Sequence, residues 1–325
     1  MADDQLAQRA RENAGDPDGS LALAADLGTS LAIPGRGQTR RRWQLLADVG
    51  AVDLTVARVL EAHTDALAIL AEAGQPPPTG SWGVFAAEAP GVRLEASPSG
   101  TDVTLHGTKP WCSLAGKLDH ALVTAHVGDD RGLFAVDLRQ PGVHVEPAEG
   151  WVSRGLAGIP SGPVRFDGVP ARPVGEPGWY LRRPGFAWGG IGVAACWLGA
   201  TRALAETLRT GVARRESDLD ALHVGALDLA IHAAATCLRD AAERVDAGTA
   251  TGPAGEVLAL RVRSLVAAAV EQAIARVGHA LGPAPLTFDE EHARRVADLQ
   301  VYVRQHHAER DLAALGRFVI ADGDA

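Results

Sequence analysis

Three consecutive prolines, Pro76–Pro78, divide the sequence at the point where its pattern changes. Before them, apolar residues such as Leu60 and Leu67 recur at the 3.6-residue period of a helix, and this pattern ends at Gly74. Proline has no backbone N–H and restricts the residue before it to extended geometry, so a helix cannot continue through this run. The sequence therefore predicts an N-terminal helical domain over residues 1–80.

After the prolines, short apolar or alternating runs are separated by turn residues. This spacing predicts an antiparallel β unit, a β-barrel domain of about six to eight strands, over residues 81–175. Strands do not alternate with helices here, which excludes a doubly wound α/β unit. The predicted strands cover Trp82–Ala87, Arg93–Ala96, Asp102–His106, His120–Ala125, Gly132–Leu138, Val143–Val145 and Pro163–Phe166.

From residue 176 to residue 325 the helical pattern returns, and short turns containing glycine and proline interrupt it. Short connections place consecutive helices antiparallel, so this part is predicted to form a C-terminal four-helix bundle. The whole chain is therefore predicted to be an α+β protein with three units. The predicted helices of the bundle cover residues 186–212, 218–247, 253–280 and 289–314.

Charge and composition exclude several classes of function. The formal net charge is −9 at pH 7 and no basic face is evident, which opposes binding of nucleic acid or of an anionic membrane. The longest uncharged stretch, 184–201, is shorter than the ~20 apolar residues that span a bilayer, and we expect a buried helix there. The N-terminus lacks the pattern of a signal peptide. We expect a cytoplasmic protein.

Cysteines and histidines do not predict a metal site. The three cysteines, Cys112, Cys196 and Cys237, are far apart and show no spacing that suits zinc, which fits a reducing compartment. His306 and His307 are adjacent and would point apart on a helix. No metal ligand is therefore predicted.

One segment of the β unit resembles a motif of a known enzyme family. Leu105-His-Gly-Thr-Lys-Pro-Trp-Cys-Ser113, followed by Asp119-His-Ala-Leu-Val123, is similar to a segment of the acyl-CoA dehydrogenases, and the order of the three units is also that of this family. These are flavoproteins whose flavin ring lies between the barrel and the bundle. The resemblance implies an FAD cofactor with Trp111, Cys112 and Ser113 against its isoalloxazine ring, where a flat ring needs an apolar wall and a few donors.

Two further segments resemble cofactor contacts of the family. Phe85-Ala-Ala-Glu-Ala-Pro-Gly91 replaces a Thr-Glu-Pro motif and its Gly-Ser-Asp loop, which implies that Phe85 and Ala87 lie at the flavin. Ala87 has no hydroxyl, so only its backbone can bond the ring. Gln272-Ala-Ile-Ala-Arg-Val-Gly-His-Ala-Leu-Gly282 resembles a glycine turn, which implies that Gly278 and Gly282 approach the adenosine of a neighbouring subunit's flavin.

The family's catalytic glutamate is absent. In many members this glutamate removes the substrate α-proton and lies about eight residues after an Arg-Asp pair. Here Asp298 matches the Asp, and His306 stands eight residues later. Histidine can act as a base near neutral pH, and monooxygenase relatives also use it. Glu309 follows three residues on and could orient the imidazole or act as a displaced base. His306 and Glu309 are the candidate catalytic residues.

Three functions follow from the resemblance. The first is FAD-dependent oxidation of the Cα–Cβ bond of an acyl-CoA thioester. The second is a reduced-flavin-dependent monooxygenase on the same fold. The third is a non-catalytic subunit of a hetero-oligomeric acyl-CoA dehydrogenase. We expect a small-molecule substrate, with acyl-CoA as the first choice, and either a homo-oligomer or a hetero-oligomer with a full-length relative.

Overall fold

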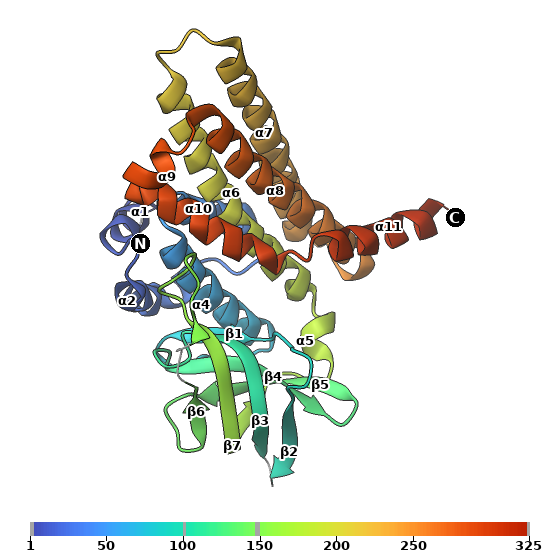
Figure 1. The fold of residues 1–325 in the computed structure, drawn as a ribbon. Helices are drawn as coiled ribbons and strands as arrows, with labels where there is room; N and C mark the ends of the chain where they lie inside the picture. Colours follow the sequence, from blue (N-terminus) through green and yellow to red (C-terminus); the bar gives the residue numbers. More distant parts are fainter. Residues whose placement is uncertain (1–2, 100–101, 147–149, 324–325) are drawn as a thin grey trace.

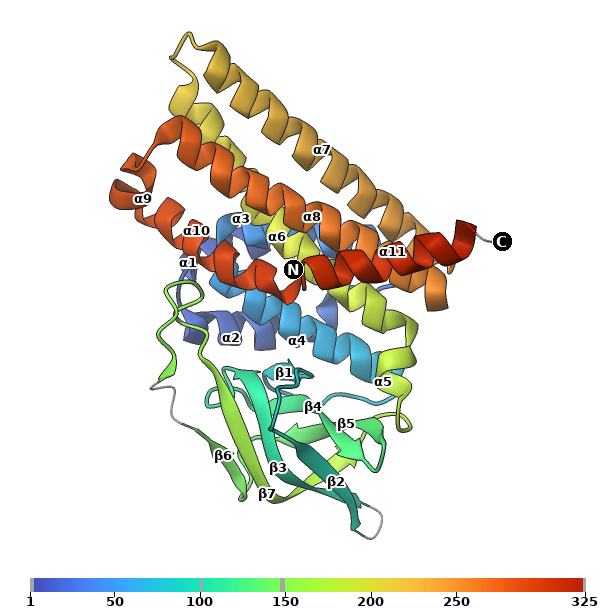
Figure 2. The same cartoon turned by 45° about the vertical axis from the view of Figure 1, so that its right-hand side comes forward.

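The computed structural model describes residues 3–99, 102–146 and 150–323, and it confirms the predicted α+β fold class. The barrel lies at one end of the molecule, the helical bundle at the other, and the N-terminal helices between them (Figures 1 and 2). One continuous core joins the three units. The N-terminal helices are α1 (Asp3–Glu12), α2 (Pro17–Leu27), α3 (Thr39–Val52) and α4 (Leu54–Glu72).

Helix α4 occupies the centre of the molecule. Its N-cap is Asp53, whose side chain accepts a hydrogen bond from the Val56 N–H at 3.0 Å. The helix ends at Glu72, before Gly74 takes a left-handed conformation with φ +69° and the prolines follow, as predicted. α4 packs on β1, α6 and α10, so almost every turn of it is buried.

The strands form the predicted barrel, but two of their pairs are parallel. The sheet order is β1-β4-β2-β3-β7-β5, and β5 also pairs with β4, which closes the ring. The pairs β1–β4 and β2–β4 are parallel, unlike the all-antiparallel prediction. The long connection that a parallel pair requires comes from the intervening strands. The strands are β1 (Trp82–Phe85), β2 (Leu94–Ser99), β3 (Asp102–Ser113), β4 (His120–Val127), β5 (Asp130–Asp137), β6 (Val143–Val145) and β7 (Ser161–Pro173).

Long helices follow the barrel and build the bundle. In both views α6, α7 and α8 run side by side (Figures 1 and 2), and α10 packs against α6 and α4. The elements are α5 (Trp179–Arg182), α6 (Pro184–Val212), α7 (Asp218–Asp246), α8 (Gly252–Leu281), α9 (Ala284–Phe288), α10 (Glu290–Tyr302) and α11 (Glu309–Gly323).

The prediction of one continuous helix over residues 289–314 is wrong. The chain leaves the helix after Val303–Gln305, His306 is extended, and Ala308 has φ +47°. The Asp311 carboxylate accepts the His307 N–H at 3.0 Å, and His306 Nδ1 accepts the Ala308 N–H at 3.2 Å. These local side-chain bonds replace helical ones, so α11 starts in a new direction.

Helix α7 is the one described helix that is long and apolar enough to cross a membrane by length and composition alone. It lies on the outside of the bundle, and only 17% of its most apolar window is buried. Leu219 and Leu229 are 71% and 70% exposed. Such a single helix is weak evidence for a membrane span.

The crossing of α3 and α6 yields a test of the fold. A Cβ atom added to Gly199 would lie 1.8 Å from the Ala47 carbonyl oxygen. Because backbone cannot rotate away, we expect Gly199→Ala to lower the free energy of unfolding by about 3 kcal/mol or more in chemical denaturation. Gly225→Ala is the control, because nothing surrounds this exposed position on α7. There alanine should stabilise the helix by about 0.5–1 kcal/mol. Equal stability of Gly199→Ala and the wild type would contradict the described crossing.

Candidate active site

A bulge in β3 turns Trp111 outward. The pairing of β3 with β7 shifts register between Lys109 and Cys112, and Trp111 takes a left-handed conformation with φ +58°. A β-bulge redirects a side chain, and positive φ is strained for a bulky residue. The indole is 58% exposed, whereas Trp43, Trp82 and Trp197 are buried in the core. The barrel therefore presents an aromatic face at the residue that the resemblance places against a flavin.

The two residues after Trp111 differ in how far they are buried. Cys112 is 1% exposed, and burial raises the pKa of its thiol to about 12, so only its backbone is available to a ligand. Ser113 is half-buried at the end of β3. Its hydroxyl shares a hydrogen bond with the Ser161 hydroxyl at 2.8 Å and accepts one from Arg58 at 3.4 Å.

The loop after β1 is anchored by a buried lysine. Lys109 Nζ donates to Glu88 at 2.6 Å and to the Thr124 hydroxyl at 2.8 Å. This ion pair holds the loop that contains Ala87, which is exposed and offers a flavin only backbone groups. Phe85 is 2% exposed and belongs to the core.

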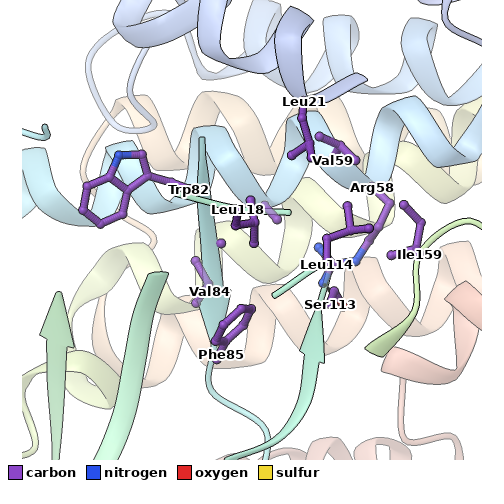
Figure 3. A pocket seen from close by; sticks show the side chains of 12 residues that line it. Leu21, Arg58, Val59, Trp82, Val84, Phe85, Ser113, Leu114, Leu118 and Ile159 are labelled. Atoms are coloured by element: carbon purple, nitrogen blue, oxygen red, sulfur yellow. Dashed lines mark hydrogen bonds between the residues drawn. The ribbon is translucent and has the colours of Figure 1, made fainter. Parts of the chain in front are cut away.

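Arg58 reaches from α4 to the end of β3. Figure 3 shows its side chain beside Ser113 and Leu114, at a small cavity of about 20 Å³ that Phe85 also lines. The Arg58 guanidinium donates to Glu61 at 2.9 Å and lies 5.9 Å from the centre of the Tyr302 ring. The wall formed by β3 is thus connected through one arginine to the interior of the helical part.

A much larger cavity, of about 460 Å³, lies between α4, α6, α8 and α11. Its apolar lining includes Tyr180, Phe186, Val193 and Phe318. Its charged lining is unusual for a site that would hold a hydrocarbon chain, because charged groups are expensive to bury unless they are paired. These charged side chains are Glu61, Asp65, Arg183, Glu256, Arg263 and Asp311.

The charged side chains of α4 share one face of that helix. Glu61 is paired with Arg58, and Arg183 is paired with Glu72 at 2.7 Å. Burial raises the pKa of Asp65, and neighbouring arginines act in the opposite direction. The face therefore combines ion pairs with one carboxylate, Asp65, for which no such pair is found within the described residues.

Arg263 enters the cavity from α8. Its guanidinium donates to the carbonyl oxygens of Gly190 at 2.6 Å and Gln305 at 2.7 Å, and stacks 5.1 Å from the centre of the Trp197 ring. Burial lowers its pKa. The arginine ties the break between α10 and α11 to the start of α6.

His306 lies at this break but is turned away from the cavity. Its Nε2 is 3.0 Å from the Ser264 hydroxyl, and its Nδ1 accepts the Ala308 N–H, so both ring nitrogens have partners. Burial lowers the pKa of the imidazole, and Asp311 acts in the opposite direction. Its neighbour His307 lines the cavity instead, with Nδ1 at 3.3 Å from Asp311.

Glu309 does not face His306. It is exposed in the first turn of α11 and is not among the cavity residues. The carboxylate near His306 is Asp311, at 3.7 Å from Nε2. The expected contact between Glu309 and His306 on one helix is therefore not formed, because the helix is broken between them.

Gly278 and Gly282 lie at the far end of α8 from the barrel (Figures 1 and 2). Gly282 has φ +67° and caps α8, and no atom lies within 4 Å of a Cβ built at either glycine. The predicted contact with a neighbouring subunit's cofactor stays a prediction. Among the described residues, no group of three histidine, cysteine or acidic side chains could hold a metal ion.

Sequence reasoning missed the charged residues of the cavity. Arg58, Glu61, Asp65 and Glu72 recur at a spacing that places them on one face of an otherwise apolar helix. On a central helix such a face has to be buried against polar partners, and this was the signal that could have identified the site.

A buried carboxylate on α10, Asp298, predicts that the stability of the fold depends on pH. Asp298 accepts the Leu156 N–H at 2.5 Å, and burial raises the pKa of its carboxyl to about 6. A carboxyl whose pKa is higher in the folded than in the unfolded chain stabilises the fold at a pH below its unfolded-state pKa. This stabilisation is lost as the pH rises from about 4 through 6. Across this range the free energy of unfolding of the wild type should fall by on the order of 2–3 kcal/mol, as measured by urea denaturation. Asp298→Asn should abolish this fall.

Asp298→Ala is the comparison, because it also removes the acceptor for Leu156. It should be less stable than Asp298→Asn at every pH. An unchanged pH dependence in Asp298→Asn would mean that another group titrates.

No family model and no curated protein matches the sequence. Solved structures match over almost their entire length. The FMN-bound dibenzothiophene monooxygenase TdsC from Paenibacillus sp. A11-2 has a TM-score of 0.82 at 16% identity, over 98% of this chain and 96% of that one. Butyryl-CoA dehydrogenase from Megasphaera elsdenii has 0.80 at 16% identity, over 97% and 94%. A variant of the steroid ACAD Tcur3481-Tcur3483 has 0.78 at 21% identity, over 99% of each chain. In agreement with the resemblance in its sequence, the chain has the acyl-CoA dehydrogenase fold.

Proposed function

We propose that the chain is a flavin-dependent oxidoreductase that uses FAD to oxidise the Cα–Cβ bond of an acyl-CoA thioester. The observation that carries this proposal is the outward-turned Trp111, which a strained bulge holds exposed at the end of the barrel. Strain of this kind persists where the surrounding structure maintains it, often at ligand sites. An aromatic face with a hydroxyl two residues away suits a flat ring that has a polar edge.

The residues near Trp111 fit a flavin ring. Trp111 supplies the wall, the Ser113 hydroxyl supplies a polar group, and Ala87 contributes backbone only. When bound, an oxidised flavin accepts the two electrons that leave the substrate. Arg58 links this wall to the large cavity, because its guanidinium donates to the Ser113 hydroxyl and to the cavity residue Glu61. Its apolar side chains would hold the acyl group and exclude water.

Two comparisons bear on the choice of reaction. TdsC is a monooxygenase with FMN, and butyryl-CoA dehydrogenase is named for an acyl-CoA substrate, yet this chain resembles both equally well in fold. We favour the dehydrogenase because carboxylates line the cavity, and a carboxylate suits removal of a proton next to a carbonyl. A soluble protein with small-molecule substrates fits this choice.

One spectrum tests the proposal. Purified protein should absorb in the near-ultraviolet and blue, and mass spectrometry of the released cofactor should identify FAD. Anaerobic addition of butyryl-CoA or a longer thioester should bleach the blue band. A band that bleaches only with an external reductant, followed by oxygen consumption with an aromatic substrate, would favour the monooxygenase. A colourless protein that takes up no flavin would reject both enzymes for the isolated chain.

The aromatic wall makes a quantitative prediction. Trp111→Ala should weaken flavin affinity about tenfold, or ~1.4 kcal/mol, because it removes one face of contact, and Trp111→Phe should keep most of the affinity. Leu229→Ala is the control, since Leu229 is 70% exposed on α7, away from both predicted flavin contacts. Fluorescence titration of the apoprotein with FAD gives the three affinities. Equal affinities for Trp111→Ala and Leu229→Ala would remove Trp111 from the site.

A second candidate, a non-catalytic subunit of a hetero-oligomer, is favoured by a different observation. Arg58 already donates to Ser113, and Ala87 lacks a hydroxyl, so the wall has few free side-chain groups for a flavin. A colourless chain that raises the activity of a co-expressed full-length relative would support this candidate. Binding of one FAD per isolated chain would contradict it.

A further inference from the structure

We propose that Glu61, on α4, is the group that takes the proton from the substrate carbon next to the thioester carbonyl. This inference rests on the proposed function, because it assigns the base for the same reaction. It departs from the pattern that the sequence resembles, in which a glutamate near the last two helices performs this step. Glu61 comes from the N-terminal part of the chain instead.

The hydrogen bonds of Glu61 leave one oxygen free for a substrate. Arg58 donates to Oε2 at 2.9 Å, and the Tyr302 hydroxyl donates to the same Oε2 at 3.1 Å. Within the described part of the chain Oε1 accepts no hydrogen bond, and it is also absent from the buried atoms that lack a partner. Since Glu61 lines the large cavity, Oε1 is the oxygen that a ligand there can reach.

The other candidates for a base are less suitable. Both nitrogens of His306 have partners, and Glu309 is exposed outside the cavity. Asp311 is engaged by His307, through its backbone N–H and its ring. Asp65 lines the cavity one turn farther along α4, away from the Ser113 end.

Glu61 is also on the side of the cavity that faces the aromatic wall. Arg58 contacts Glu61 with one nitrogen and the Ser113 hydroxyl with another, at 3.4 Å. Arg58 therefore links the carboxylate to Ser113, which is a residue of the predicted flavin site.

The surroundings of Glu61 suit a base. Burial raises its pKa, whereas Arg58 and the Tyr302 hydroxyl act in the opposite direction. The other charged groups that act on it are Asp65 on the same helix, Arg42 on α3 and Arg263 on α8. A carboxylate that two fixed donors hold in place, and that is more basic than one in water, is matched to proton abstraction.

The step balances without a further reactant. The Cα–H bond breaks, the proton forms an O–H bond with Oε1, and the electron pair stays on Cα to form the Cα=Cβ bond. A bound oxidised flavin would accept the hydride from Cβ together with its two electrons. When the flavin is already reduced, the proton can only return, or a deuteron from solvent can replace it.

Hydrogen exchange therefore tests Glu61 separately from oxidation. The full-length protein, with its flavin reduced by dithionite, is incubated in D₂O with butyryl-CoA, hexanoyl-CoA or 3-phenylpropanoyl-CoA, and deuterium at Cα is measured by NMR. We expect the wild type to exchange with at least one thioester and Glu61→Gln to exchange at least 100-fold more slowly. Glu61→Asp should recover part of the rate because it restores a carboxylate.

Glu271→Gln is the matched control, because Glu271 is an exposed carboxylate on α8 that also pairs with an arginine, Arg304. It should exchange like the wild type. Melting curves and flavin content check that Glu61→Gln is folded and loaded. A loaded Glu61→Gln variant that exchanges at the wild-type rate, or a loaded wild type that exchanges none of the three thioesters, overturns the assignment. If the protein binds no flavin but exchanges Cα hydrogen through Glu61, the oxidoreductase proposal fails and the assignment stands.

Tyr302→Phe supplies a signature that a purely structural carboxylate would not give. Loss of its donor removes a bond to the charged form, so the pKa of Glu61 should rise, and the acid limb of the exchange rate should move to higher pH. An acid limb that stays in place in a folded Tyr302→Phe protein counts against Glu61 as the titrating base.

Discussion

A buried ion pair between Arg58 and Glu61 connects three parts of the molecule. Arg58 extends to Ser113 at the end of β3, Glu61 accepts the hydroxyl of Tyr302 on α10, and both acidic and basic members come from α4. Two desolvated charges repay their cost only when the geometry is good and further hydrogen bonds satisfy them. The additional hydrogen bonds, from Tyr302 to Glu61 and from Arg58 to Ser113, therefore stabilise this pair in the core. Loss of one member would leave a buried charge unpaired, at a cost of about 3–5 kcal/mol.

The other buried cations of the cavity also depend on partners that satisfy their charge. Arg183 is 2% exposed and relies on Glu72, while Arg263 relies on two backbone carbonyls and an indole face. Each cation is held by groups from a different element, so the cavity keeps its shape only if these elements stay in register. A polar interior of this kind specifies one arrangement of helices more strictly than an apolar one of the same volume. It also distinguishes the site from a simple slot for a hydrocarbon tail.

Local patterns predicted the units of the fold but not their contacts. The strand and helix positions follow from periodicity, from Pro76–Pro78 and from turn residues, and the structure has each of the predicted strands. Parallel pairing of β1 with β4 depends on contacts between strands that are far apart in sequence. The break at His306 depends on Asp311 and His306 bonding to nearby backbone, which a hydrophobic pattern does not reveal.

The candidate site was harder to predict for a related reason. The resemblance pointed to Trp111 and Ser113, where a local motif is enough, and the structure places Trp111 on the surface of the barrel. It also led to His306 by counting residues, but counting cannot tell which of two adjacent histidines turns into a cavity. Glu61 was not predicted, because its pattern is that of any charged position on an amphipathic helix. Only the packing of α10 and α6 around α4 makes it interior.

The contact between Glu61 and Tyr302 also has a consequence for how the chain folds. These residues are 241 positions apart, and Arg295 reaches the Ala51 carbonyl over 244 positions. Contacts of such long sequence separation form late, because closing the intervening loop costs entropy before it is rewarded. During synthesis, α4 emerges with its charges exposed and cannot complete its surroundings until α10 has left the ribosome. Helix α4 is thus synthesised early, but its packing partners are complete only near the end of synthesis. Until then its apolar and charged faces need protection from aggregation.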